Sequence, residues 1–280
     1  MNSPSSHIGF QRLLVPVDLS RTSAAPLPFA LHIARQYSSK LLIVHVLPEA
    51  PGDKNLEDKR FHDAVSTLIG SNDDYETIVQ VGNVRELLPA LIAQSGSDLV
   101  VMATHGSHGV EKLIGGSGAQ EIMCSAAVPV LAIGAQVTHP PSFQRILYAT
   151  DFSTGSEAAL RYAVSFAKHF GGSLVLLHVN EWRSKEPPAE AQHRTLEYFR
   201  THVLNTGLQG LDARDVLVRF GAGDHEILAA AAEHAIDLIV MGIHCKHGIM
   251  RRLSAHLPGP ISYDVMWQAP CAVLTVPVAT

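Results

Sequence analysis

Small and hydroxyl-bearing residues gather in one stretch of this chain, Val100–Ser125. It opens with a short apolar run that predicts a buried parallel strand. A loop of small residues follows, and Ser117 and Gln120 then have the S-x-x-Q spacing of a helix capping box, with three glycines around Ser117. Because a helix N-terminus carries about half a positive charge and has unpaired N–H groups, this stretch suits a phosphate group. An ordinary strand–loop–helix turn with a good cap is the alternative.

Length and composition limit the number of domains and argue against several classes of partner. A chain of 280 residues predicts one large domain or two of about 140. A net charge of −5 with no basic run argues against nucleic acid and against an anionic membrane surface. There is no apolar stretch of spanning length and no signal-peptide pattern at the start, and the three cysteines form no C-x-x-C pair. We therefore expect a cytoplasmic protein.

The chain repeats itself. Arg12–Ser20 returns as Arg145–Ser153, 133 residues later, and the run L-L-I-V-H-V returns as L-V-L-L-H-V at the same offset. Asp98–Met102 returns as Asp237–Met241, 139 residues later. Similar segments in the same order, with small changes in offset, indicate a duplicated unit with loop insertions.

Strand-like and helix-like segments alternate in each unit. In the first half we expect strands at Leu13–Val17, Leu41–Val46, Thr77–Val81, Leu99–Met102 and Val128–Ile133, and helices at Thr22–Tyr37, Lys54–Ile69, Val84–Gln94 and after Ser117. On the second of these helices, Phe61, Val65 and Leu68 are expected to share the buried face. The sequence predicts an α/β fold of two tandem doubly wound domains, residues 1–137 and 143–280, joined by Gln136–Ser142. Each should have a five-stranded, mainly parallel sheet with helices on both faces.

Ligands in such sheets bind beyond the carboxyl ends of the strands, where the strand order reverses. Asp18 ends the first predicted strand, and the loop before Ser117 follows the fourth. These two segments are the natural occupants of that crevice.

The combination of V-P-V-D-x-S, H-V after the second strand, and M-A-T-H-G followed by nine residues and G-S resembles the universal stress protein family, twice along the chain. The family's nucleotide signature, Gly-x2-Gly-x9-Gly-Ser/Thr, maps onto Ala103, Gly106, Gly116 and Ser117, so alanine replaces the first glycine. The resemblance implies the strand order 3-2-1-4-5 in each domain. It also implies that Asp18 holds the ribose or adenine edge, that Val46 meets adenine through its backbone, and that the loop wraps the phosphates. The nucleotide-binding residues expected on this basis are Pro16, Val17, Asp18, Val46, Met102, Ala103, Gly106, Gly116, Ser117, Gly118 and Ala119.

The second half departs from that signature. Gly242 keeps the first position, but Cys245 stands at the second, and the loop that follows is four residues longer. After Gly259 the hydroxyl residue is replaced by Pro260, which has neither a hydroxyl nor a backbone N–H. We therefore expect one ATP per chain, bound in the first half.

Histidines offer a second kind of chemistry. His45 and His178 each close a strand and are expected to be structural. His244, Cys245 and His247, expected in the loop after the fourth strand, are residue types that zinc accepts, but their spacing matches no standard site. We predict neither a metal site nor a catalytic residue.

Other enzyme classes lack their motifs. There is no G-x-x-x-x-G-K-[ST], no G-x-G-x-x-G after the first strand, and no G-x-S-x-G. The leading hypothesis is an ATP-binding stress-response module, with or without Mg²⁺, whose halves form an internal pseudo-dimer; a homodimer of chains is a further option. A slow Mg²⁺-dependent ATPase and a nucleotide-free scaffold for another small ligand are the alternatives.

Overall fold

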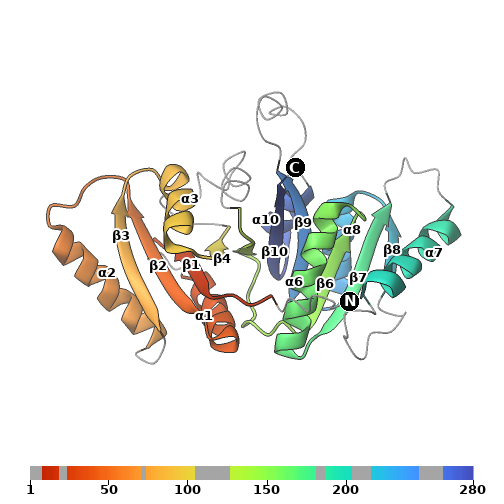
Figure 1. The fold of residues 1–280 in the computed structure, drawn as a ribbon, viewed down its shortest axis with the longest axis horizontal. Coiled ribbons are helices and arrows are strands. Elements are labelled where there is room, and N and C mark those ends of the chain that lie inside the picture. Colours follow the sequence, from red (N-terminus) through yellow and green to blue (C-terminus); the bar gives the residue numbers. More distant parts are fainter. Residues whose placement is uncertain are drawn as a thin grey trace, which may run out of the picture.

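The computed structural model describes residues 8–18, 24–70, 74–104, 127–180, 187–203, 216–245 and 261–279. Within these ranges strands and helices alternate through two halves (Figure 1). The first half contains β1 (Arg12–Pro16), α1 (Pro26–Tyr37), β2 (Lys40–Leu47), α2 (Lys54–Ile69), β3 (Tyr75–Val81), α3 (Val84–Ser95), β4 (Leu99–Ala103) and β5 (Val130–Ile133). The second contains β6 (Arg145–Thr150), α6 (Thr154–Phe170), β7 (Ser173–Asn180), α7 (Pro188–Tyr198), the π-helical turn η1 (Phe199–Val203), β8 (Val216–Phe220), α8 (Gly223–Glu233), β9 (Leu238–Cys245), α10 (Ile261–Gln268) and β10 (Ala272–Ala279).

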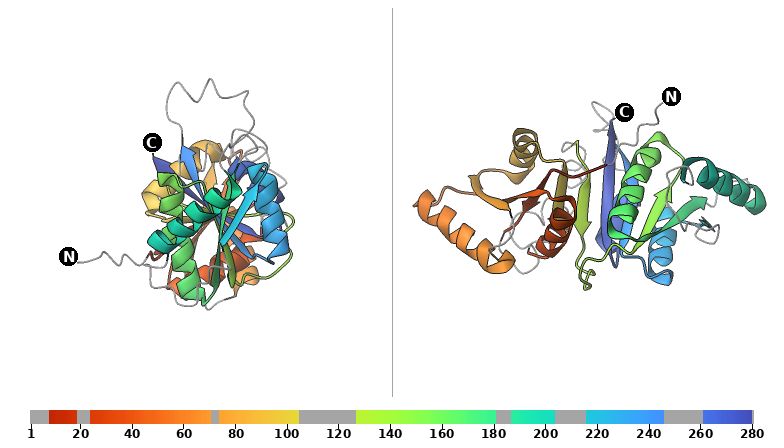
Figure 2. Two further views of the ribbon diagram at one scale, coloured as in Figure 1. Left: turned by 90° about the vertical axis from the view of Figure 1, so that its right-hand side faces the viewer. Right: turned by 60° about the horizontal axis from the view of Figure 1, so that its bottom comes forward.

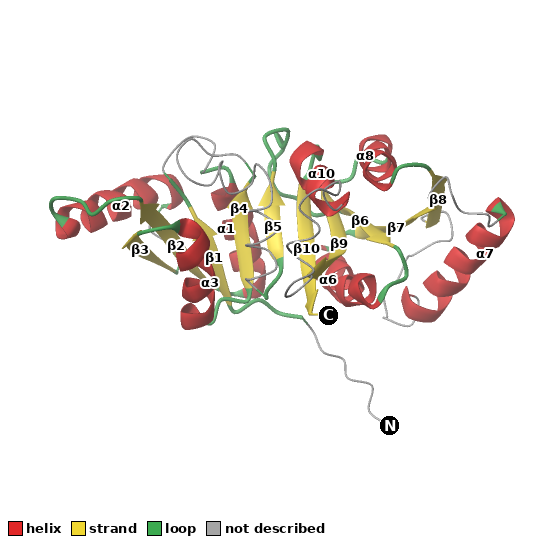
Figure 3. Ribbon diagram, turned by 90° about the horizontal axis from the view of Figure 1, so that it is seen from above, coloured by secondary structure: helices red, strands yellow, loops and turns green. Residues whose placement is uncertain are grey.

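All ten described strands form one sheet, in the order β3-β2-β1-β4-β5-β10-β9-β6-β7-β8 (Figure 3). Each half has the predicted 3-2-1-4-5 order and parallel pairing. The halves meet where β5 pairs antiparallel with β10, for example Leu131 with Leu274. The end-on view in Figure 2 shows the strands rotating progressively along the sheet, as right-handed strand twist requires. The predicted tandem fold is confirmed, and the sequence did not show that the two sheets fuse.

The sheet is buried on both faces because its inner strands are continuous apolar runs. Every residue of β4 and β5 is buried. One core layer lies between the sheet and the helices α1, α2, α6 and α7, and the other lies under α3, α8 and α10. Each face of the sheet is therefore covered by a layer of helices. A ligand can then reach the sheet at the ends of its strands.

A repeated aspartate fixes the start of the first strand in each half. The Asp98 carboxylate accepts hydrogen bonds from the backbone N–H groups of Gln11 (2.7 Å) and Arg12 (3.2 Å). Asp237 does the same for Gln144 (2.8 Å) and Arg145 (3.1 Å). The Asp-Leu-x-Val-Met repeat therefore has a structural origin.

Aromatic side chains join the halves on one face of the sheet. Phe143, two residues before β6, is fully buried, and its ring centroid lies 6.1 Å from that of Phe29 in α1. Across the same interface the Tyr37 hydroxyl of α1 lies 3.1 Å from Ser165 Oγ, and the Tyr37 ring stacks on His169 at 4.2 Å. The two halves thus share a core.

Two local predictions were wrong. The first helix begins at Pro26, not at Thr22: Ala24 and Ala25 form a turn, and Pro26 occupies the first helical turn, where proline needs no N–H partner. On α2, Leu68 is 56% exposed. The residues that face the core are Phe61, Val65 and Ile69, which are spaced four apart. The helix therefore contacts the core along its i, i+4 ridge, and Leu68, three residues after Val65, lies outside that ridge.

The predicted domain limits, residues 1–137 and 143–280, remain a proposal. They place the division between β5 and β6, inside the segment that carries Phe143.

Candidate nucleotide site

The strand order of the first half reverses between β1 and β4. From β1 the chain continues to β2 on one side, whereas β4 pairs with β1 on the other, Leu13 opposite Leu99 and Leu14 opposite Val100. The segments that follow β1 and β4 therefore leave neighbouring strands at the carboxyl edge, where open α/β sheets bind ligands.

The end of β1 is held tightly against β2. Pro16 is paired with Val44, and the buried Val17 donates its N–H to the Val44 carbonyl at 2.8 Å. His45 Nδ1 lies 2.9 Å from the Val17 carbonyl, which can only accept, so Nδ1 carries the proton. The His45 ring stacks on Phe61 at 5.2 Å. These contacts confirm the structural role predicted for His45, and they fix the backbone immediately before Asp18, a half-buried residue.

Val46 directs its backbone toward the same edge. The Val44 carbonyl bonds toward β1, and the Leu47 carbonyl accepts from Gly82 beyond β3. Because successive residues of a strand alternate the side to which they bond, Val46 turns its N–H and C=O toward β1, past the residue where that strand ends.

Met102 and Ala103 close β4 and are buried, as is Thr104, whose N–H donates to the Ile133 carbonyl at 2.9 Å. The remaining predicted site residues lie outside the described part of the chain, which ends here and resumes at Ala127. They are Gly106, Gly116, Ser117, Gly118 and Ala119.

The corresponding aspartate of the second half is used by its own turn. Asp151 Oδ1 accepts the Ser153 N–H at 3.0 Å, directly before α6. Partial desolvation raises the pKa of Asp151, but the hydrogen bonds from Ser153 and Ser156 outweigh it, so the pKa lies below the ordinary value. This carboxylate is therefore stabilised as an anion at the start of a helix.

Gly242 has a packing role that the sequence did not indicate. A Cβ at Gly242 would lie 2.3 Å from the Gly155 carbonyl oxygen and 2.8 Å from the Ser156 nitrogen. The first turn of α6 thus sits directly on β9. The equivalent residue in the first half is Ala103, and there the helix begins only at Pro26.

The fourth strand is also longer in the second half. β9 continues through His244 to Cys245, paired with Ala279 of β10, whereas β4 ends at Ala103. The expectation that His244 belongs to a loop was wrong, because β10 extends the ladder. Cys245, at the position of Gly106, is likewise a strand residue. The third residue of that zinc hypothesis, His247, lies outside the described residues.

A family model described as the universal stress protein family matches the chain twice, over residues 9–134 and 142–277. The chain belongs to this family. Universal stress protein A homolog 1 of Coxiella burnetii is 28% identical over 141 residues, which are 44% of this chain and 96% of that protein. Universal stress protein MJ0577 of Methanocaldococcus jannaschii is 25% identical over 158 residues, 48% of this chain and 94% of that protein. The crystal structure of a universal stress protein from Archaeoglobus fulgidus has the same fold over 95% of this chain and 96% of its own, with a TM-score of 0.71 and 22% identity.

In this universal stress protein, a helix of the second half packs beside the end of β4, where the first half's site is predicted. Gly134 follows β5, and a Cβ there would lie 3.4 Å from the Met266 carbonyl, 3.5 Å from the Ala269 carbonyl and 3.7 Å from Thr104 Oγ1. The end of α10 therefore packs beside Thr104. Sequence reasoning missed this contact, because only the antiparallel pairing of β5 with β10 produces it.

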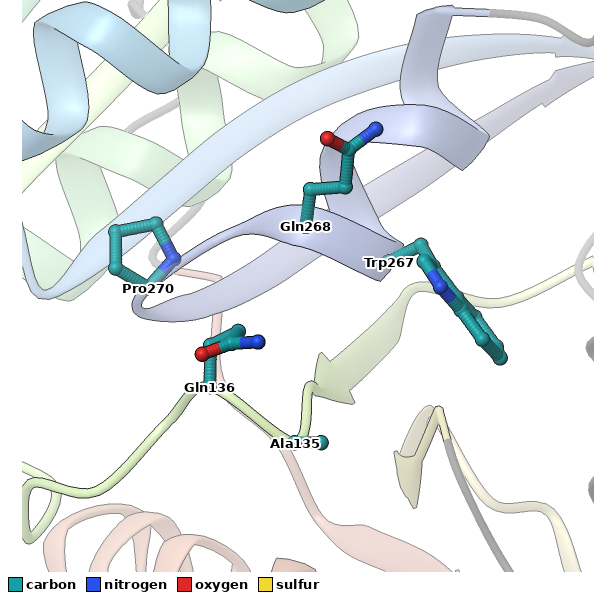
Figure 4. Close-up of a pocket in the computed structure, with 5 residues that line it drawn as sticks. All are labelled: Ala135, Gln136, Trp267, Gln268 and Pro270. Atoms are coloured by element: carbon teal, nitrogen blue, oxygen red, sulfur yellow. The ribbon is translucent and has the colours of Figure 1, made fainter.

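A cavity of about 380 Å³ lies at the same junction, lined by Ala135, Gln136, Trp267, Gln268 and Pro270 (Figure 4). The Trp267 indole and the Gln268 amide point away from Gln136 in Figure 4. These side chains do not converge on a common point, and none of them belongs to the predicted site.

Within the described ranges, no group of three or more His, Cys, Asp or Glu residues could hold a metal ion. Nor is any helix in those ranges long and apolar enough to cross a membrane.

Proposed function

We propose that the first half of this universal stress protein binds ATP, with Mg²⁺ accompanying the phosphates, and that the occupied site sets the state of a cytoplasmic stress-response module. The observation that supports this most directly is the adjacency of β1 and β4. Because these strands are neighbours, their carboxyl ends, which are followed by Asp18 and by Thr104, lie at the same edge of the sheet. The Gly-rich spacing up to Ser117 suits the phosphates there.

The nucleotide's two ends are assigned to different elements. Asp18 and the backbone of Val46, at the β1–β2 end of this edge, would meet the ribose and adenine. Gly106, Gly116 and Ser117 would meet the phosphates through N–H groups and one hydroxyl. Ala103 in place of glycine adds one methyl group, which we expect to weaken binding without abolishing it.

Two structural features of the second half support a single site. The first turn of α6 rests on Gly242, and the position of Gly106 is taken by Cys245 within β9. Pro260 also lacks the hydroxyl and the N–H that Ser117 offers. Losing two charge-assisted hydrogen bonds costs about 3–6 kcal/mol, enough to turn micromolar binding into millimolar or weaker.

Calorimetric titration with Mg-ATP tests the proposal. We expect about one ATP per chain, binding that is lost when Gly116→Val and Ser117→Ala are combined, and binding that is kept in the matched second-half variant Asp151→Ala. A stoichiometry near two would assign ATP to both halves. Binding that survives the combined Gly116→Val and Ser117→Ala changes but is lost in Asp151→Ala would assign it to the second half instead. No heat and no thermal shift at millimolar Mg-ATP would exclude an ATP site.

A further inference from the structure

The second half contains a polar cluster that the first half lacks. The two halves share a histidine at the end of their second strand, His45 and His178, and both Nδ1 atoms bond to the carbonyl of the residue that closes the first strand or directly follows it. Around His178, five apolar residues of the first half have polar counterparts. Tyr148, Thr150, Asn180, Arg194 and Tyr198 stand where Val15, Val17, Leu47, Phe61 and Val65 stand 133 positions earlier.

The contacts around the two histidines confirm this equivalence. Phe61 stacks on His45, and Arg194 occupies the corresponding place with Nη2 3.1 Å from His178 Nε2. The Thr150 carbonyl, 2.8 Å from His178 Nδ1, can only accept, so Nδ1 is protonated and Nε2 is the acceptor for the arginine. The guanidinium also lies over the Phe152 ring, 5.1 Å from its centroid. Thus the first half has an aromatic ring where the second has a cation.

Asn180 is the member of the cluster that has a buried side-chain atom without a hydrogen-bond partner. Its side chain is 6% exposed, and its Oδ1 lies 3.5 Å from Arg194 Nη2 and 3.2 Å from His178 Nε2. Its Nδ2 is fully buried and has no hydrogen-bond partner in the structure as described. Turning the amide over would give Nδ2 the His178 acceptor, but it would also place Nδ2 3.5 Å from the Arg194 guanidinium, where two donors would face each other. The carbonyl oxygen therefore stays toward the cation, and Nδ2 is the atom without a partner. A buried amide atom without a partner is costly, so something outside the described residues is expected to meet it.

The charge of the cluster decides which kind of ligand could bind beside Asn180 Nδ2. Arg194 is the one of the five polar residues that is ionised at neutral pH, and its side chain reaches the surface. Burial raises the pKa of Tyr198, and the charges of Glu157 and Asp151 add to the rise, so these two carboxylates lie near the tyrosine of the cluster. A guanidinium beside an amide N–H donor favours an oxygen anion.

We propose that Asn180 and Arg194 bind a small oxyanion, a carboxylate or a phosphate group, at the carboxyl ends of β6 and β7 in the second half. The Asn180 Nδ2 donates to the anion, Arg194 supplies the charge, and His178 holds the guanidinium in place. The site lies on the α6 and α7 face of the sheet, and it is separate from the ATP site proposed for the first half. The second half is therefore a receptor for a ligand of its own.

Calorimetry on the full-length chain, titrated in separate arms with inorganic phosphate and with succinate, tests this proposal and distinguishes the two sources of oxyanion. Each titration is run with and without saturating Mg-ATP, so a failure of ATP to bind leaves the measurement intact. We expect one of the two anions to bind once per chain. The variants Asn180→Leu and Arg194→Phe, which introduce the residues of the first half, should each weaken it about tenfold or more.

Arg200→Phe is the matched control, because Arg200 is also an exposed arginine, in the adjoining η1 turn, and is not a member of the cluster. It should leave anion binding unchanged. Thermal unfolding with and without the anion checks that the variants fold, and the anion should stabilise the unmodified chain and Arg200→Phe alone. If neither anion binds at about 10 mM, or if Asn180→Leu and Arg194→Phe bind it as tightly as the unmodified chain, the amide faces an internal water and the proposal is wrong.

Discussion

Gly242 of β9 and Gly155 of α6 touch backbone to backbone. A side chain at Gly242 would place its first carbon 2.3 Å from the Gly155 carbonyl oxygen, far inside contact distance. In the first half, Ala103 replaces that glycine, and α1 begins five residues later than α6 does by the repeat. The glycine of the second half is therefore required by helix packing, whatever ligand that half binds.

Gly242→Ala should destabilise the protein by about 2 kcal/mol or more, because the backbone of α6 has to move away from β9. The reverse change in the first half, Ala103→Gly, should cost only about 0.5–1 kcal/mol through chain entropy. Urea unfolding of both variants measures the difference. Equal destabilisation in the two halves would contradict the packing role of Gly242.

Ser117→Ala should lower the affinity for Mg-ATP about tenfold or more, since it removes a hydroxyl expected to donate to a phosphate. It should also cost about 1 kcal/mol of stability through loss of the helix cap. Calorimetry and thermal unfolding separate the two effects. A folded Ser117→Ala variant with unchanged affinity would make the capping box purely structural.

The interface between the halves should weaken in acid through His32. Its ring lies 4.9 Å from Phe170 and 5.7 Å from Phe143, and its Nε2 is buried with no hydrogen-bond partner in the part of the chain described. Burial first, and then the charge of Arg35, lower the pKa of His32 below 6.5. The native state therefore binds fewer protons than the unfolded state, so this contribution is present above pH 6.5 and is lost as the pH falls below it.

Unfolding measured from pH 7.5 to about pH 5 checks this effect. His32→Phe, which keeps a ring between Phe143 and Phe170, should show a smaller loss of stability toward acid than the unmodified chain. His193→Gln, at an exposed histidine of α7, is the control and should lose stability as the unmodified chain does. If His32→Phe and the unmodified chain lose stability in parallel, His32 does not cause the acid sensitivity.

Much of the fold follows from local patterns in the sequence. Continuous apolar runs mark the buried parallel strands, and α2 begins and ends at the predicted residues, Lys54 and Ile69. The role of His45 also follows, because a histidine closing a buried strand needs a partner that a neighbouring strand end supplies. The exposed Leu68 shows the limit of such patterns: helical periodicity gives a face, but the crossing of the helix over the sheet decides which residues of that face touch it.

The candidate site also has features that the sequence could predict and features that it could not. The position of Asp18 at a strand end could be predicted because it depends on residues next to it in sequence. The packing of Met266 beside Gly134 could not, since those residues meet only through the edge pairing of β5 with β10. The contact of Arg194 with His178 was missed for a related reason: an arginine in a polar helix has the same pattern whether it faces water or a buried histidine.

By itself the sequence determined the duplication, the alternation of strands and helices, and the degenerate signature of the second half, because each of these is a property of local spacing or residue type. Only the tertiary structure decided that the halves share one sheet, that Gly242 serves α6, and that Asn180 is buried beside a cation. Those features depend on the distance between segments far apart in the chain. That distance is set by how strand edges and helix faces fit together, which no local pattern encodes.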